Sequence, residues 1–389
     1  MQKLPYGSTW SNREADGKFF KNIGSVVVQR PDGCRQFKWI FKHFTQGVPA
    51  PKDGYKAFGE QWHQQLSAAT AVEDLRLRDP KSDHVFWLGH ASSLLCLASG
   101  TNIIFDPIFS HRASPFTFAG PARKFAAPTK IDELPNIDIV TISHDHFDHM
   151  DEASLRKIYK RFPDVQFVVP LGIDKLLEEL KIPTASIHAL DWWEERRVKD
   201  VVVGCAPAQH WGKRSLLDRN SHLWCGWVVG WGEAVDAGAA TGSFSATSPT
   251  ATSAAASDAA EDVNGVIPGE PTVDWSAAKT FYFTGDTSYN EEMFRLIHRR
   301  FPRIDMAALP IGAYAPRWFM SGAHIDPENV SKVFNILQVR RAYGVHWGTF
   351  ELADEPLDEP PQVLQEAKKA EGIDNDAFVC IRTGGSLSF

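Results

Sequence analysis

The chain has 389 residues and a formal net charge of −7, and 43% of its residues are hydrophobic against 23% charged. This composition is typical of a globular protein with a large core, and no long basic block appears, so we predict no nucleic-acid partner. The five cysteines are scattered and form no C-x-x-C pair, which argues against a disulfide framework and against a thiolate metal cluster.

The N-terminal residues lack the apolar run of a signal peptide. The longest apolar stretch, residues 223–231, has about half the length that a membrane-spanning helix needs. Together with reduced cysteines, these features predict an intracellular protein that is cytoplasmic or bound peripherally to an internal membrane.

The first 80 residues are polar, aromatic and irregular, with 26–29 as their clearest strand, and they predict an arm packed on the core. Residues 81–389 predict one domain of alternating strands and helices. Strands are expected at 84–89, 92–98, 102–107, 137–143, 166–170, 201–207, 223–231, 280–286, 305–312, 342–347 and 377–383. Helices are expected at 152–162, 172–180, 290–301, 326–337 and 359–370. Because early strands follow one another directly and later ones are separated by helices, we predict an α/β (α+β) fold with face-to-face sheets and outer helices.

Residues 233–274 interrupt this pattern. They are rich in Ala, Ser, Thr and Gly, and Phe244 is their only aromatic residue. This composition predicts a disordered insertion between two strands, with a docking or modification segment as the alternative.

The stretch "TISHDHFDHMD", residues 141–151, follows an apolar run and contains the pattern H-x-H-x-D-H. Its chemistry-bearing members are His144, His146, Asp148 and His149. This spacing is not that of a helical face, but a turn can direct all four side chains into one cavity. Imidazole nitrogen and carboxylate oxygen suit Zn²⁺ or a similar divalent ion. The alternative is a solvated, histidine-rich turn.

Three more potential ligands follow later strands. His210 comes after 201–207, Asp286 ends 280–286, and His346 lies at the end of another β-rich run. Each alone is more often a core or surface residue, but loops at the carboxyl ends of strands commonly build active sites. The sequence therefore predicts a two-metal site.

The order H-x-H-x-D-H, His, Asp, His resembles the metallo-β-lactamase superfamily. That resemblance implies an αββα four-layer sandwich and a hydrolase domain over residues 81–389. More narrowly, several motifs are similar to the N-acylphosphatidylethanolamine-hydrolysing phospholipase D family, over residues 84 to 357. They are "WLGHASSLL" (87–95), "FDPIFSHRASP" (105–115), "AQHWGKRSLLD" (208–218), "FTGDTSY" (283–289), "LPIGAYAPRWFM" (309–320), "HIDPE" (324–328) and "HWGTFELADEP" (346–356).

The resemblance implies two Zn²⁺ per chain. One ion would be held by His144, His146 and His210, and the other by Asp148, His149 and His346, with Asp286 bridging both. The implied reaction cleaves N-acylphosphatidylethanolamine to an N-acylethanolamine and phosphatidic acid through a metal-bridging hydroxide.

Asp148, Asp286 and His324 are the expected catalytic residues. A protonated His324 would bind phosphate or donate a proton to the leaving group, and the alternative is a capping histidine before a helix. The resemblance also implies that His90 and Asp106 support the metal ligands. Asp106 before Pro107 could equally be a turn former.

The remaining expectations concern substrate and partners. A phospholipid substrate, peripheral membrane contact and a homodimer follow from the resemblance. Two departures from the family pattern are Thr117–Phe118 in place of a Gln-Tyr pair and Ala323 in place of Gln. The expected substrate contacts are His324, Phe116, Thr117, Phe118, Trp318 and Phe319.

Two other functions stay open at this stage. One is a hydrolase of the same fold acting on a soluble phosphodiester or a lactone of a phosphorylated sugar, which needs no apolar channel. The other is a metal-poor lipid-binding or scaffolding protein, which the presence of all seven ligand positions disfavours.

Overall fold

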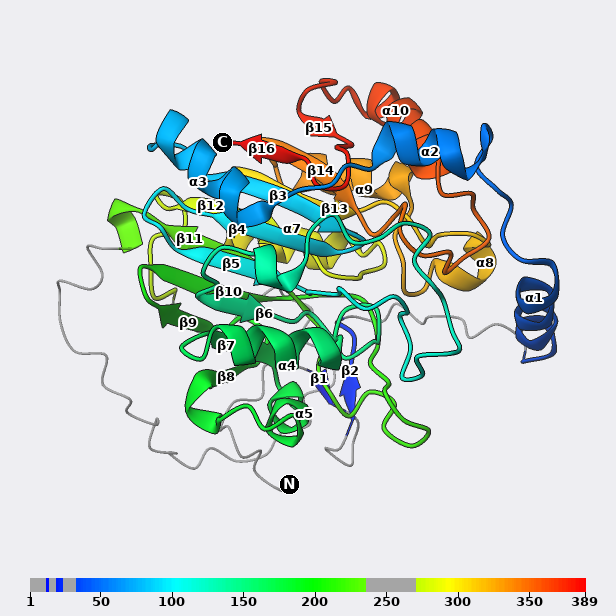
Figure 1. Ribbon diagram of the computed structural model, residues 1–389, viewed down its shortest axis with the longest axis horizontal. Helices are drawn as coiled ribbons and strands as arrows, with labels where there is room; N and C mark the ends of the chain where they lie inside the picture. The colour runs from blue at the N-terminus through cyan, green and yellow to red at the C-terminus, as the bar shows by residue number, and fades with distance from the viewer. Residues whose placement is uncertain (1–11, 14–18, 24–32, 236–270) are drawn as a thin grey trace.

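The computed structural model describes residues 12–13, 19–23, 33–235 and 271–389. Two seven-stranded sheets stack at the centre of the molecule, with helices on both outer sides (Figure 1). This is the predicted four-layer αββα arrangement. The strand expected at 26–29 and most of the expected insertion, 236–270, lie outside the described residues.

The first sheet combines antiparallel and parallel pairing. β16, β3, β4 and β5 pair antiparallel, and β5, β6, β7 and β8 pair parallel. In spatial order its strands are β16 (Ser386–Ser388), β3 (His84–Gly89), β4 (Ser92–Cys96), β5 (Asn102–Phe105), β6 (Ile139–Thr141), β7 (Gln166–Pro170) and β8 (Ile187–Leu190). Its helical elements are η1 (Ile131–Glu133), α4 (Glu152–Arg161), α5 (Ile173–Glu179) and η2 (Thr184–Ser186).

The second sheet repeats this combination. β12, β13, β14 and β15 pair parallel, whereas β9, β10, β11 and β12 pair antiparallel. In spatial order its strands are β15 (Phe378–Val379), β14 (Arg341–Val345), β13 (Met306–Pro310), β12 (Lys279–Phe283), β11 (Cys225–Trp231), β10 (Val201–Pro207) and β9 (Glu195–Val198). Its helices are α7 (Glu291–Arg300), α8 (Arg317–Met320), α9 (Pro327–Ile336) and α10 (Glu359–Glu371).

The strands are buried on both faces, which explains their nearly continuous apolar sequences. In β3, Val85 and Trp87 enter the core between the sheets, while Phe86 and Leu88 enter the core beneath the outer helices. This alternation is the two-residue period of a strand applied to two apolar environments. Stacked sheets and covering helices therefore leave the strand ends as the places where polar chemistry can gather.

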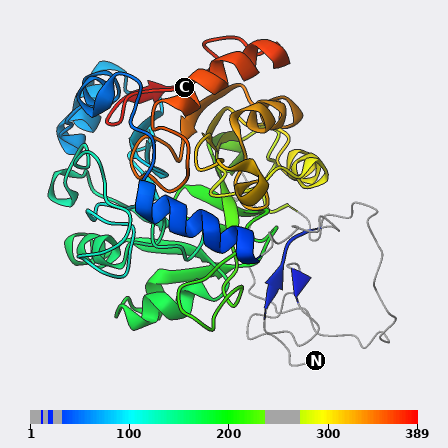
Figure 2. The ribbon, with the colours of Figure 1, turned by 90° about the vertical axis from the view of Figure 1, so that its right-hand side faces the viewer.

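The N-terminal region contains helices that the sequence did not predict. They are α1 (Gly33–Gln46), α2 (Gly54–Trp62) and α3 (Ala68–Arg78), and a short pair of strands, β1 (Asn12–Arg13) and β2 (Phe20–Lys21), precedes them. Phe58 joins the core between the sheets, and Ala68 and Val72 join the other core. Figure 2 shows α1 lying across one end of the molecule. No helix among the described residues is long and apolar enough to cross a membrane.

The ends of the expected 233–274 insertion belong to the folded domain. Residues 233–235 form a helical turn whose Val235 is fully buried, and Val273 is buried as well. The predicted insertion was therefore too long at both ends, because a composition averaged over the segment does not reveal single apolar residues that pack on the core.

Candidate metal centre

The loop between β6 and α4 carries the H-x-H-x-D-H pattern, and Asp106 holds its base. The Asp106 carboxylate accepts hydrogen bonds from the Ser143 backbone N–H at 2.7 Å and from the Ser143 hydroxyl at 2.5 Å. It also lies 2.7 Å from Nδ1 of His149. At the far end of the loop, Asp151 caps α4 by accepting from the Ala153 N–H. The loop therefore has a fixed entry and a fixed exit.

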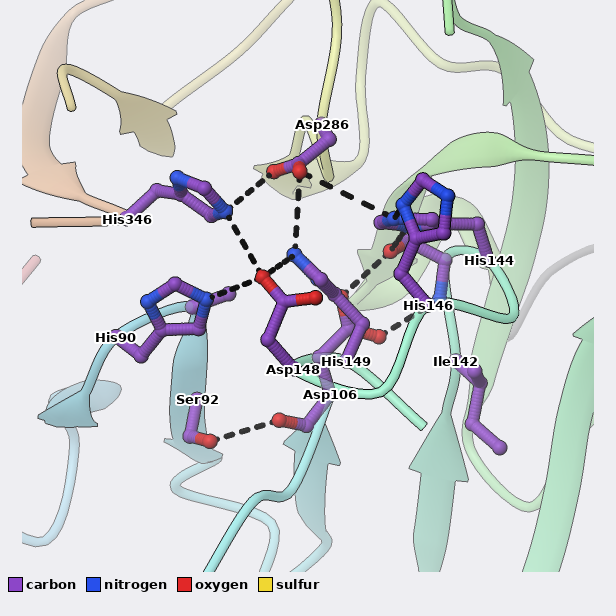
Figure 3. Close-up of polar contacts among 12 residues, drawn as sticks. His90, Ser92, Asp106, Ile142, His144, His146, Asp148, His149, Asp286 and His346 are labelled. Carbon is purple, nitrogen blue, oxygen red and sulfur yellow. Dashed lines mark hydrogen bonds and ion pairs between the residues drawn. The ribbon is translucent and has the colours of Figure 1, made fainter. Parts of the chain in front are cut away.

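The second sheet supplies the other three predicted ligands from separate strands. His210 follows β10, Asp286 follows β12 and His346 follows β14. All three are at least 97% buried, and Figure 3 shows Asp286 and His346 facing the loop histidines. The carboxyl ends of these strands thus place three of the candidate ligands beside the metal loop.

Three imidazole nitrogens converge on one side of this centre. His146 Nδ1 lies 2.8 Å from His144 Nε2 and 3.2 Å from His210 Nε2. The Nδ1–H of His210 donates to the Ala323 carbonyl at 2.8 Å, so its Nε2 carries a lone pair. The Ser143 hydroxyl donates to Asp106 and therefore accepts from His144 Nδ1, which leaves Nε2 of His144 with a lone pair too. The lone pairs of His144 and His210 therefore both point toward Nδ1 of His146, and a cation bound there would take one nitrogen from each of the three rings.

Carboxylates dominate the other side. The Asp148 Oδ2 atom lies 3.4 Å from Nε2 of His149 and 3.4 Å from Nε2 of His346. Asp286 faces both sides, because its Oδ1 is 3.1 Å from His346 Nε2 while its Oδ2 is 3.9 Å from His144 Nε2 and 3.8 Å from His210 Nε2. Asp286 is thus placed where a bridging ligand between two cations would lie.

Electrostatics divide the histidines in the same way. Burial and neighbouring histidines lower the pKa of His144 well below its usual value, and burial likewise lowers the pKa of His210. Burial also acts to lower the pKa of His346, but the carboxylates of Asp286 and Asp148 outweigh it and raise that pKa to about 9. On the side of His144 and His210 the site therefore offers neutral nitrogen donors. On the side of His346 the two carboxylates create a negative potential that stabilises positive charge.

Several buried polar atoms of this centre have no hydrogen-bond partner among the described residues. Within the described part of the chain, buried atoms without a hydrogen-bond partner include His146 Nε2, His149 Nε2, Asp286 Oδ1 and both ring nitrogens of His346. Such atoms are costly in a protein interior unless something else binds them. Four groups of candidate ligand atoms, each within 4.8 Å of one another, overlap here. The donor set of imidazoles and carboxylates fits divalent metal ions.

Comparison with known proteins places this centre in a family. The family described as "Beta-lactamase superfamily domain" matches residues 101–252 and 250–347. The "N-acyl-phosphatidylethanolamine-hydrolyzing phospholipase D 1" of Caenorhabditis elegans is 33% identical over 384 residues, which cover 95% of this chain and 92% of that protein. The chain belongs to the N-acyl-phosphatidylethanolamine-hydrolysing phospholipase D family. It is a metal-dependent hydrolase of the β-lactamase superfamily.

A second phospholipase D relative is the mitochondrial protein of Saccharomyces cerevisiae, which is 31% identical over 78% of this chain. This chain spans only 55% of the length of that protein. Among solved structures, the isothiocyanate hydrolase from Delia radicum gut bacteria aligns with a TM-score of 0.54 at 18% identity, covering 79% of this chain and 99% of its own. That structure supports the fold alone.

In this member of the phospholipase D family, His90 contacts two of the proposed metal ligands directly, Asp148 and His346. Its Nε2 lies 2.8 Å from Asp148 Oδ2, and its carbonyl accepts from the His346 N–H at 2.9 Å and from the Trp87 indole at 2.7 Å. The Thr349 hydroxyl accepts the His90 N–H at 2.7 Å. His90 therefore orients one ligand through its ring and a second through its backbone.

Two further residues at the centre escaped the sequence analysis. Asn22 binds His210 at both backbone atoms, donating to its carbonyl and accepting its N–H, each at 2.9 Å. Asp145, between two ligand histidines, is fully buried and lies 2.9 Å from Nδ1 of His222. Neither has a sequence signal, because Asn22 acts from a distant segment and the Asp145 carboxylate binds Lys213 and His222, far along the chain.

His324 reaches the centre, as predicted, with its Nδ1 3.6 Å from Asp286 Oδ2. Burial lowers the pKa of His324 to about 4, so its imidazole is neutral at pH 7. A neutral ring can still donate one N–H to a phosphate oxygen, and an anionic ligand beside it raises its pKa again. The protonated form that the sequence suggested would therefore depend on substrate being bound.

The predicted substrate-contact aromatics fall into two groups. Phe116 and Thr117 line a hollow of about 580 Å³ together with Phe147, which lies between two ligands in the metal loop. The Phe118 ring lies beside that of Phe116 in a tilted arrangement, with ring centroids 5.6 Å apart. Trp318 and Phe319 instead contact α1. Arg35 lies 4.0 Å over the Trp318 ring, and Trp39 packs on Phe319 at 4.6 Å.

Proposed function

We propose that this protein is a zinc-dependent phosphodiesterase of the phospholipase D type, which hydrolyses N-acylphosphatidylethanolamine to an N-acylethanolamine and phosphatidic acid. The observation that carries this proposal is the convergence of seven candidate ligands, five of them buried, with Asp286 between two donor sets, in a chain that matches the C. elegans enzyme over nearly its full length. A phospholipid substrate requires peripheral contact with a membrane.

The two donor sets would hold one ion each. His144, His146 and His210 form the nitrogen-only set, and Asp148, His149 and His346 form the mixed set. Zn²⁺ bound here supplies Lewis acidity toward phosphate oxygens and a bound water that is deprotonated near neutral pH.

The side chains of the protein perform the remaining tasks. Asp106 fixes the ring orientation of His149, and Asp148 is held by His90. His324 lies on the solvent-accessible side of Asp286, 17% exposed, where it can donate a proton or a hydrogen bond to the departing oxygen. Burial of the other ligands excludes water that would compete for the same cations.

Product analysis tests this proposal directly. Vesicles containing one defined N-acylphosphatidylethanolamine are incubated with the enzyme in H₂¹⁸O, and the products are identified by mass spectrometry. Attack at phosphorus breaks the bond between phosphorus and the ethanolamine oxygen, so one ¹⁸O is expected in phosphatidic acid and none in the N-acylethanolamine. Elemental analysis is expected to give two zinc ions per chain.

Water-soluble phosphodiesters and lactones form the control arm. Turnover of these compounds with no product from the phospholipid would replace the proposed substrate with a soluble one. Release of a free fatty acid, instead of phosphatidic acid, would show that the bond cleaved is not the phosphodiester.

A further inference from the structure

Two loops next to the metal centre expose large apolar side chains. Phe116 is 56% exposed and Phe118 80% exposed on one loop, and Leu216 and Leu217 are 89% and 91% exposed on the other. Isolated exposed apolar residues are ordinary on protein surfaces, but two neighbouring pairs are not. We call residues 110–122 and 212–220 the tip loops. Both lie toward the right of Figure 1, at the same end as α8.

The tip loops border one hollow. Residues 114–117 of the first loop and Arg214 of the second line the same cavity of about 580 Å³. Residues 150–153, which follow the last ligand of the metal loop, form another part of its wall. Phe116 thus lines the hollow itself, and the other exposed side chains lie on the two loops that border it, while Phe147 connects its wall to the metal loop.

Hydrogen bonds close the neck of the first tip loop. The Arg123 N–H donates to the His111 carbonyl at 2.8 Å, and the Ala113 N–H donates to the Pro121 carbonyl at 3.0 Å. The guanidinium of Arg112 reaches across to the Gly120 carbonyl at 2.5 Å. The two phenylalanines are thus held outward by a closed loop.

The second tip loop is closed in the same manner. The Asn220 N–H donates to the Gly212 carbonyl at 2.8 Å, and the Lys213 N–H donates to the buried Asp145 carboxylate at 2.8 Å. Within the loop, the Ser215 N–H donates to Asp218 at 2.8 Å. The two leucines lie at the tip of this anchored turn, so their exposure is imposed by polar contacts at its base.

Positive charge lies behind the apolar tips. Arg112, Arg156 and Arg214 line the hollow, where they face the carboxylates of Asp151 and Glu152. Asp151 is occupied by the α4 cap and the Ser110 backbone, and Glu152 pairs with both Arg156 and Arg214. A local excess of arginine is notable in a chain whose formal charge is −7.

We propose that the tip loops dock the enzyme on a phospholipid bilayer that contains anionic lipids. Leu216, Leu217, Phe116 and Phe118 enter the outer acyl region, and the arginines of the hollow lie at the level of the lipid phosphates. Apolar tips backed by basic side chains are what interfacial binding to an anionic bilayer requires. This inference rests on the proposed lipid substrate, because it places the opening beside the metal centre against the membrane.

Paired serine substitutions test the docking. The double variant Leu216→Ser/Leu217→Ser removes apolar area without touching the neck contacts, and Leu77→Ser on α3 is the matched control. Leu77 is 77% exposed, and α3 lies toward the opposite side of Figure 1. Co-sedimentation with vesicles of phosphatidylcholine and phosphatidylserine is expected to fall at least about tenfold for the double variant and to stay unchanged for Leu77→Ser.

Turnover separates docking from chemistry. A monomeric short-chain N-acylated phosphodiester should be hydrolysed by the double variant as fast as by the unaltered enzyme, while hydrolysis of vesicle-embedded substrate should fall with binding. Equal vesicle binding by the double variant and the unaltered enzyme would overturn the docking proposal. If no N-acylated substrate is hydrolysed, the proposed function fails, and the sedimentation result still decides the docking proposal by itself.

The charge component has its own test. Arg156→Gln removes one exposed guanidinium, and vesicle binding by this variant should lose part of its dependence on phosphatidylserine content and on salt.

A double leucine variant that loses self-association in light scattering, but keeps full vesicle binding, would assign the tips to a second copy of the chain and exclude the bilayer.

Discussion

The two sheets contribute to the metal centre in different ways. The first sheet supplies four proposed ligands from the loop after β6, within residues 144–149, whereas the second supplies three proposed ligands from the ends of three strands, at positions 210, 286 and 346. The contiguous set is held at the base of its loop, where Ser143 binds Asp106 from the end of the neighbouring strand β5. The dispersed set is held by the fold, so its geometry depends on correct pairing of the whole second sheet.

Asp286 gives the largest expected effect, because it joins the contiguous and dispersed sets. Asp286→Ala should lower kcat at least about 10³-fold, since both ions lose a ligand that also keeps them together. Steady-state hydrolysis and elemental analysis measure this loss. Asp274→Ala, an exposed aspartate before β12, is the control and should retain activity. An Asp286→Ala enzyme with normal turnover would disprove the bridging role.

Substituting His210 or His346 tests the two donor sets one at a time, because His210 belongs to the nitrogen-only set and His346 to the mixed set. His210→Ala and His346→Ala should each reduce bound zinc from two ions to one, and each should lower kcat about 10²-fold or more because one cation no longer stabilises the phosphate. Zinc is counted by elemental analysis after gel filtration. His298→Ala on α7 should keep both ions. Retention of two ions in either ligand variant would show that the residue is not a ligand.

Asp106 tests the support of the contiguous set. Asp106→Asn removes the carboxylate that orients His149 and accepts from Ser143, so metal affinity or activity should fall by about 10- to 100-fold. Competition with a fluorescent zinc chelator measures the affinity. An unchanged affinity would mean that Ser143 and the α4 cap fix the loop without this carboxylate.

Asn22 gives the smallest expected effect, and it tests support of the dispersed set from outside the sheet. Asn22→Ala removes two hydrogen bonds to the His210 backbone, each worth about 1 kcal/mol, so zinc affinity should weaken by about tenfold or less. The same competition assay measures it. A loss as large as that of His210→Ala would indicate that the N-terminal segment is needed for the second sheet to form at all.

This comparison also explains what could be predicted from the sequence. All eleven expected strand regions contain a strand, because buried strands carry continuous apolar residues that stand out. β8, β9 and β16 were missed, since they are edge strands with sequences such as "ERRV" whose side chains are mostly only partly buried or exposed. The helices α2 and α3 were missed because few of their residues reach the core: α2 buries only Phe58, and α3 buries only Ala68 and Val72.

The same reasoning applies to the site. The seven proposed ligands combine costly polar side chains with strand ends, and the fold places them in overlapping groups of candidate ligand atoms. Asn22, Asp145 and His222 act through a few hydrogen bonds formed across long sequence separations, and a single sequence contains no periodicity that marks such contacts. Residues that position ligands therefore needed the three-dimensional arrangement to be found.

The hairpin formed by β11 and β12 has a practical consequence. Trp231 pairs with Lys279 where the chain leaves one strand and enters the other, and Asp286 follows the opposite end of β12. The five residues of β12, about 15 Å of strand, thus separate the connected end of this hairpin from the metal centre. A fluorescent reporter domain spliced between residues 236 and 270 would be attached on the side of the sheet remote from the catalytic chemistry. That position offers a way to follow the enzyme in living cells without labelling either terminus.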